Sequence, residues 1–446
     1  MIIPGLIIGL ALTLMSGSTV LKCIGLNKQL TLAERVALGF LLGEGVITLL
    51  LFWSFFLPWP GRVYWLGAGI TLLYLVFTRP RISFPKWPQF KGVWTLRQTA
   101  CFILFILLLL KISYVFVDAC SKPECSWDAC THITKPGVYA YYVDTLQLAT
   151  VPEMLKGIGG PVGYYPKMIP FMHYWLFSWM GQVNDQWSKI IFPLNLACLL
   201  MLFYCNLKIT RGRGGALLFT CLLAGSNFLL HYATIGFADL TNGIYFSVGL
   251  FYFYRWIKER DDCYFWLVAI FLALTTWIKL EGKLYYLLGF SSLIIYLWQE
   301  RRDKIFFYLT KYLAAYVIIG LPWQLFVSLN GLATREVLAF KTQSLLPLQT
   351  NIGQILFFSG TWGLFGPGLL AVLFFFPWGA LRKNIYLFII LILFYLTVNF
   401  LYLGTEDALG IFWISFSRVW LAIYPFTLFL AGIIVPRFKL GRLGWF

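Results

Sequence analysis

A short polar run, WDACTHITK at positions 127–135, interrupts a chain that is otherwise strongly apolar. Asp128 carries a carboxylate, and Lys135 ends the run with a cation. A carboxylate that takes the proton from a hydroxyl group turns that hydroxyl into a nucleophile. The run therefore predicts a catalytic site in which Asp128 acts as the general base.

Further polar residues occur at the ends of long apolar segments or in the loops that join them. Ionisable groups at the edge of a membrane are costly to place there and are usually functional. The candidates are Asp118, Lys135, Tyr164, Tyr165, Lys167, His173, Asp239, Lys279, Glu281 and Arg418. The topology derived below puts them all on one face of the membrane, so we expect them to line one outward-facing cavity with Asp128.

One base surrounded by cations and apolar walls suits a lipid-linked phosphate. Lys and Arg hold phosphate by charge-assisted hydrogen bonds, for which Lys167 is the first candidate, and an apolar groove takes a polyprenyl tail. A sugar that leaves from a phosphate needs no general acid, because the phosphate departs as a stable anion. Glycoside hydrolysis, by contrast, normally needs two carboxylates. Direct attack on the anomeric carbon with Asp128 as the only base inverts the sugar configuration.

The composition identifies a polytopic, all-α membrane protein. Mean hydropathy is +0.77, and only 12% of the 446 residues are charged. A helix needs about 20 apolar residues to cross a bilayer. Segments that meet this requirement predict thirteen transmembrane helices near 3–21, 37–58, 61–78, 99–117, 187–207, 214–234, 239–256, 263–278, 284–299, 305–328, 353–378, 384–403 and 417–435.

Basic residues predict the orientation, because Lys and Arg concentrate in cytoplasmic loops. The segment 78–98 holds five basic residues and no acidic one, which makes it cytoplasmic. Alternation from there puts the N-terminus outside and the C-terminus in the cytoplasm. Counting 168–180 as a span would reverse every later loop, so we expect it to lie on the membrane surface as an amphipathic helix. The net charge of +17 is then a topology signal and gives no indication of nucleic-acid binding.

Two outer loops are long, at 118–189 and 329–352, and the first contains a predicted interfacial helix at 137–157. Cys120, Cys125 and Cys130 fall in this first loop. Two of them can pair in an oxidising compartment. Together with His132 they also supply four metal donors, but their spacing matches no closed zinc site, which favours a disulfide or free thiols.

The motifs WDA at 127–129, YYPKMIPFMHYW at 164–175, FADL at 237–240, WIKLEG at 277–282 and the segment from 417 occur in a familiar order. Their arrangement resembles the GT-C glycosyltransferases, which are integral membrane enzymes that use polyprenyl-phosphate sugars. The likeness is to the bacterial-type members related to protein O-mannosyltransferases and the lipid A aminoarabinose transferase. The WWDYG motif of oligosaccharyltransferases is missing, which argues against peptide N-glycosylation.

The resemblance implies a fold, a membrane and roles for particular residues. It implies a three-helix N-terminal extension at 1–98, a GT-C core at 99–328 and C-terminal helices at 329–446, in a bacterial inner membrane. Asp128 matches the catalytic base, and Lys167 with Tyr164 or Tyr165, together with Arg418, matches contacts to the donor phosphate. The implied partners are a polyprenyl-phosphate sugar, membrane lipids and an acceptor that is a lipid, a glycan or a protein. The sequence assigns no cofactor with certainty, and a divalent metal stays open.

Structural explanations compete with these roles. Asp239 also suits an N-cap, Lys279 and Glu281 suit a local ion pair, and His173 among aromatic residues suits a packed side chain. Two other functions stay open as well, namely a lipid-linked glycan polymerase or ligase and a transporter or flippase. A transporter would place its polar residues near the middle of the membrane.

Overall fold

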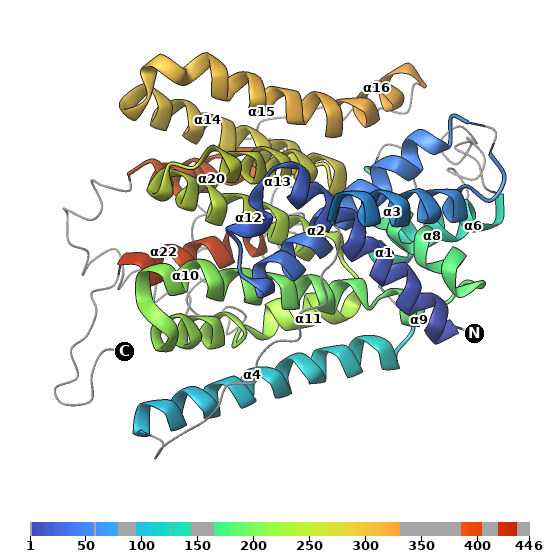
Figure 1. The fold of residues 1–446 in the computed structure, drawn as a ribbon, viewed down its shortest axis with the longest axis horizontal. Coiled ribbons are helices and arrows are strands. Elements are labelled where there is room, and N and C mark those ends of the chain that lie inside the picture. The colour runs from blue at the N-terminus through green and yellow to red at the C-terminus, as the bar shows by residue number, and fades with distance from the viewer. Residues whose placement is uncertain are drawn as a thin grey trace.

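A computed structural model describes residues 2–57, 59–78, 95–124, 126–143, 165–330, 385–403 and 418–434. These residues are almost entirely helical and include no strand, which confirms the predicted all-α class (Figure 1). The N-terminal half comprises α1 (Ile2–Cys23), α2 (Leu32–Ser54), α3 (Arg62–Thr78), α4 (Leu96–Ser121), α5 (Trp127–Ala129), the π-helix η2 (Cys130–Thr134), α6 (Lys135–Val143), α8 (Met168–Met180), α9 (Asp185–Ser188) and α10 (Ile191–Leu223). It is followed by α11 (Asn227–Ile235), α12 (Ala238–Glu259), α13 (Asp262–Ile278), α14 (Gly282–Glu300), α15 (Ile305–Ile319), α16 (Leu321–Leu329), α20 (Ile385–Leu403) and α22 (Tyr424–Ile434).

Several of these helices are long and apolar enough to cross a membrane. Four described segments meet that requirement, and a fifth does if α15 and α16, which bend by 46° at Gly320, form one span. Shorter apolar helices add to this set, which makes the chain a membrane protein. The predicted span at 353–378 lies outside the described residues, so the count of thirteen and the domain boundaries stay predictions.

The first two helices pack with their backbones in close contact. A Cβ atom at Gly43 would lie 1.8 Å from the carbonyl oxygen of Thr13, so only glycine fits there. Gly43 and Gly39 form a GxxxG pattern on α2, which is typical of membrane helices that approach closely. This pair then packs on α8 and α10, so the N-terminal helices share one core with the rest of the molecule.

The helix α10 contains the loop that the basic residues around 208–213 predict. Gly212 interrupts the helix with φ 72° and ψ −177°, a backbone conformation that favours glycine. Figure 1 shows the chain doubling back at this point toward α11. The two predicted helices at 187–207 and 214–234 therefore correspond to the two arms of α10, with α11 completing the second.

The expectation that 168–180 is an amphipathic helix with one face outside the protein is wrong, whereas its level relative to the membrane surface stays a prediction. Every residue of α8 except Trp179 is buried, and α8 contacts α1, α2, α6, α9 and α13. The physical reason is its composition, because His173 and Ser178 are the only polar side chains other than aromatic ones, and a helix that is apolar on all sides is stable only when it is covered. The surface placement came from the charge balance of the loops, which does not report burial by protein.

Candidate active site

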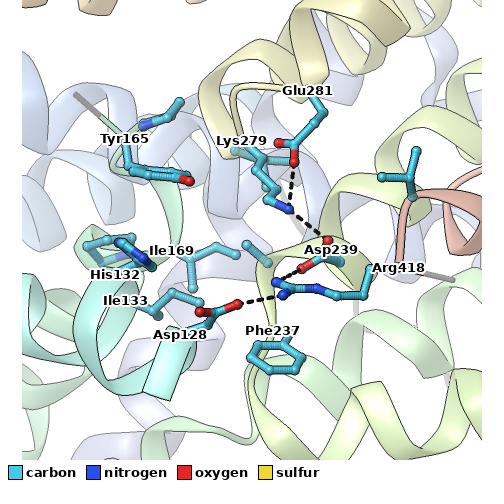
Figure 2. Close-up of a pocket in the computed structure, with 15 residues that line it drawn as sticks. Asp128, His132, Ile133, Tyr165, Ile169, Phe237, Asp239, Lys279, Glu281 and Arg418 are labelled. Atoms are coloured by element: carbon cyan, nitrogen blue, oxygen red, sulfur yellow. Dashed lines mark hydrogen bonds and ion pairs between the residues drawn. The ribbon is translucent and has the colours of Figure 1, made fainter. Parts of the chain in front are cut away.

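Five charged side chains from distant parts of the sequence form one continuous chain of ion pairs (Figure 2). Arg418 bridges two carboxylates, with Nη1 2.6 Å from Asp128 Oδ2 and Nη2 2.9 Å from Asp239 Oδ2. Lys279 Nζ lies 2.7 Å from Asp239 Oδ1 and 2.9 Å from Glu281 Oε1. The order is therefore Asp128, Arg418, Asp239, Lys279 and Glu281, in which acids and cations alternate. All five were predicted to meet in one cavity, and the structure confirms this.

Burial distinguishes the three acids. The side chain of Asp239 is 5% exposed and contacts both cations, whereas Asp128 is 30% exposed and Glu281 is 35% exposed, and each of these two contacts a single cation. A buried carboxylate held by two cations is a poor proton acceptor, because both cations favour its ionised form. Asp239 therefore orients the cations, and Asp128 and Glu281 are the two carboxylates that a substrate can reach.

Helix ends bring these residues together. Asp239 lies in the first turn of α12, Lys279 follows the last turn of α13, and Glu281 precedes α14. Burial lowers the pKa of Lys279, but Asp239 and Glu281 together raise it further, so the pKa ends above its usual value and the ammonium stays charged. The Phe237 ring lies under the Arg418 guanidinium and adds a cation–π contact, with Arg418 Cζ 4.7 Å from the ring centroid.

The turn between α13 and α14 depends on Gly282. A Cβ atom there would lie 1.8 Å from the carbonyl oxygen of Thr275, and the Thr275 hydroxyl donates a hydrogen bond of 2.9 Å to the Gly282 carbonyl oxygen. The backbone of α13 thus packs directly on the first residue of α14. This close contact places Lys279 and Glu281 next to Asp239.

We expect Gly282→Ala to destabilise the protein by about 1–3 kcal/mol, because the added methyl group meets backbone that has no room to move. The ion pairs of Lys279 with Asp239 and Glu281 should weaken as well, since Lys279 and Glu281 shift with the turn. Thermal unfolding in detergent measures the first effect. Gly69→Ala is the matched control, because a Cβ atom at Gly69 meets nothing within 4 Å. Equal melting temperatures for the two variants would contradict this role of Gly282.

Asp128 lies in the short helix α5, and hydrogen bonds to the segment around α9 hold the residues just before α5 in place. The Glu124 backbone N–H donates to Asp185 Oδ2 at 2.8 Å, Lys189 Nζ donates to the Pro123 carbonyl oxygen at 3.2 Å, and Gln186 Nε2 donates to the Cys120 carbonyl oxygen. After α5 the chain forms the five-residue π-helix η2, a conformation that is frequent at functional sites. Three hydrogen bonds and this π-helix set the position of Asp128 relative to Arg418.

Glu124 is buried next to this stretch. Its side chain packs against Gly236, where a Cβ atom would lie 2.2 Å from Glu124 Oε1. Burial raises the pKa of Glu124 to about 8, although Lys189 opposes this. At neutral pH the group is therefore mainly a protonated acid, which allows it to lie inside the protein between the Asp128 loop and the start of α12.

The ion-pair chain forms one wall of a pocket of ≈ 200 Å³. The opposite wall in Figure 2 carries Tyr165, His132 and Ile169, with the His132 and Tyr165 rings 4.6 Å apart between centroids. One water molecule occupies about 30 Å³ in the liquid, so the pocket has room for a single sugar ring or phosphate group. Burial lowers the pKa of His132, with Asp128 opposing, so the imidazole is neutral at pH 7.

Four predicted site residues do not line this pocket. Lys167 is 5% exposed with Nζ 5.5 Å from the Trp323 ring centroid, and burial lowers its pKa to about 7. His173 is fully buried with Nδ1 2.7 Å from Ser188 Oγ, which fits the packed side chain that competed with a functional role. Lys135 is exposed at the start of α6, and Asp118 pairs with Lys122. Tyr164 lies outside the described residues.

Several residues that line the pocket were not predicted as site residues, among them His132 and Phe237. His132 was considered only as a metal donor, and Phe237 only as part of the FADL motif. Their signal was present, since His132 follows Asp128 by four residues and Phe237 precedes Asp239 by two. Spacing by one helical turn would have identified His132 as a neighbour of Asp128.

The cysteines and metal donors of the 118–189 segment are only partly described. Cys120 carries a free thiol, Cys130 donates a hydrogen bond to the Glu124 carbonyl oxygen, and Cys125 lies outside the described residues. Within the described ranges, no three His, Cys, Asp or Glu side chains are grouped closely enough to hold a metal ion.

The geometry combines an accessible carboxylate, two fixed cations and a small cavity with mixed polar and apolar walls. Such a site can bind an oxyanion and take a proton from a hydroxyl group beside it. We compared the chain with protein-family models, with curated proteins and with solved structures, and none of these comparisons gave a match.

Proposed function

We propose that this protein is an inverting glycosyltransferase that moves a sugar from a polyprenyl phosphate to an acceptor hydroxyl group on the outer face of the membrane. The observation that carries the proposal is the bridge from Arg418 to both Asp128 and Asp239. It places a cation suited to phosphate next to an accessible carboxylate suited to proton transfer, within one pocket. The polar groups lie at helix ends, where a lipid-linked donor would present its sugar.

In this proposal Arg418 exchanges one partner for another. Both cations contact carboxylates, so an incoming phosphate must compete for them. Asp128 is the accessible partner of Arg418, whereas Asp239 is buried, so phosphate displaces Asp128 and leaves Asp239 in place. Donor binding thereby releases Asp128 at the time when a base is needed. Lys279 and Arg418, and not Lys167, then provide the charge that stabilises the departing phosphate.

The reaction then follows from this arrangement. The acceptor oxygen attacks the anomeric carbon from the side opposite the phosphate, and the bond from that carbon to the phosphate oxygen breaks. The phosphate leaves with the bonding electron pair, and Asp128 takes the hydroxyl proton, which it later passes to water. One displacement inverts the configuration, and no general acid is required because the leaving group is already an anion.

The test is transfer by the purified protein in lipid vesicles. We would supply polyprenyl-phosphate sugars labelled in the sugar, add a membrane extract as the source of acceptor, and follow label that leaves the polyprenyl phosphate. The expected result is protein-dependent transfer of one sugar with inverted configuration. If transfer occurs with retained configuration, or from nucleotide sugars in place of the lipid-linked donors, the proposal is wrong.

A further inference from the structure

A second cavity begins at the opposite end of α13, the helix whose last residue, Ile278, lines the pocket. It is a groove of ≈ 730 Å³ between α1, α2, α13 and α15, which is within the usual size range of ligand sites. Its walls are almost entirely apolar and include Leu42, Val46, Trp266, Ile270, Ala314 and Ile318. None of its lining residues lines the candidate active site.

The mouth of the groove and the active site lie at opposite ends of α13. The groove begins at Asp262 and Cys263, where α13 starts, whereas Lys279 of the active site follows its last residue. Seventeen residues at 1.5 Å each separate the two ends by about 25 Å, close to the thickness of the hydrocarbon core. The groove extends along α13 from Cys263 to Leu274, about 16 Å, which equals one half of a core that is about 30 Å thick.

Two charged side chains line the mouth of the groove, Asp262 and Lys311. Asp262 accepts a hydrogen bond from the Tyr308 hydroxyl and lies 3.9 Å from Arg301 Nη1, so its charge is balanced by Arg301. Lys311 belongs to none of the ion pairs found between described residues. Its ammonium instead lies 4.0 Å from the Phe307 ring centroid and 5.3 Å from the Trp266 ring centroid. Lys311 is therefore the cation of the lining that a phosphate can meet.

The position of Lys311 on α15 brings its charge toward the membrane surface. Side chains of a helix point back toward its N-terminus, and Phe307 lies one turn nearer that end than Lys311. The contact with Phe307 thus holds the ammonium close to the level at which α15 begins. A phosphate at the same level would meet this cation, while the chains below it would meet the apolar walls.

We propose that this groove binds one anionic glycerophospholipid from the leaflet opposite the active site. An acyl chain lies along α13 and α15, and the phosphate pairs with Lys311. The Lys311 ammonium favours an anionic over a zwitterionic headgroup. The lipid would hold α15 against α2 and α13 without contacting the substrate.

The experiment measures which lipid stays bound. Protein in nanodiscs that contain equal amounts of phosphatidylglycerol and phosphatidylcholine with identical chains is released into native mass spectrometry. We expect the wild type to retain phosphatidylglycerol over phosphatidylcholine by at least five-fold. Lys311→Gln should abolish this preference, whereas Lys311→Arg should keep it. Ala314→Phe fills the groove and should reduce retention of both lipids.

Lys304→Gln is the matched control, because it removes a cation at the same end of α15 that does not line the groove. It should leave the preference unchanged. Equal retention of the two lipids by the wild type would overturn the proposal, as would an equal loss in the Lys304 and Lys311 variants. A third arm adds polyprenyl phosphate to the nanodiscs. If polyprenyl phosphate displaces phosphatidylglycerol from the wild type, the groove is a site for polyprenyl phosphate and the proposal is overturned. Sugar transfer is not measured in any arm, so the outcome is independent of the proposed enzyme activity.

Discussion

Replacing Asp128 by Asn should lower sugar transfer about 10²–10⁴-fold, which is the usual contribution of a general base. Asn keeps the size and one oxygen of the side chain but cannot accept the hydroxyl proton. Binding of polyprenyl phosphate should at the same time become tighter, on the order of five-fold, because Arg418 no longer pairs with a competing carboxylate, an interaction of about 1 kcal/mol for a partly exposed pair. Transfer assays in vesicles and equilibrium binding of polyprenyl phosphate measure the two effects.

Two further variants make this result specific. Asp118→Asn removes a carboxylate that pairs with Lys122 and does not line the pocket. Transfer by this variant should stay at the wild-type rate. Glu281→Gln removes the other accessible carboxylate, and we expect a much smaller loss of transfer than for Asp128. If the losses are reversed, Glu281 is the base. Full transfer by the Asp128 variant would exclude both the base and the proposed exchange of partners.

Replacing Arg418 by Gln should destabilise the protein by about 3–5 kcal/mol, the usual cost of removing one partner of a buried ion pair. The reason is Asp239, whose side chain is 5% exposed and would keep only Lys279 as a partner. Binding of polyprenyl phosphate should be lost together with transfer. Thermal unfolding in detergent and the same binding assay measure these effects.

A double variant separates the loss of the ion pair from a general loss of packing. Asp239→Asn combined with Arg418→Gln removes both members of the pair, so its stability should exceed that of Arg418→Gln alone. Arg260→Gln is the surface control, because Arg260 is 62% exposed and its pair with Glu300 is 4.0 Å long. That control should stay within about 0.5 kcal/mol of the wild type. Additive losses in the double variant would mean that Arg418 and Asp239 do not stabilise each other.

The sequence predicted the site best for residues whose position depends on their depth in the membrane. Asp239, Lys279 and Arg418 lie at helix ends on one predicted face, and that is enough to bring them to the same level of the molecule. The alternation of helices therefore predicted a shared pocket with no knowledge of how the helices pack. Hydropathy predicted most helix positions for the same reason, because each helix must cover a fixed apolar thickness.

The face that each helix turns toward the pocket could not be predicted in the same way. Lys167 and His173 were expected to line the pocket, yet one contacts Trp323 and the other Ser188. Which side of α8 faces the pocket depends on α1, α2 and α13, whose contacts involve residues far apart in sequence. A helix that is apolar on all sides carries no pattern that distinguishes its faces, so packing alone decides them.

The bridge between Arg418 and Asp128 also has a consequence for biosynthesis. A ribosome completes the Asp128 loop long before it reaches Arg418, and at 5–20 residues per second the delay is on the order of tens of seconds. During that interval Asp239 and Lys279 can pair, but the pocket lacks its central cation. Nascent chains that do not yet contain Arg418 therefore lack the complete ion-pair chain, and the pocket acquires its full set of charges only late in synthesis.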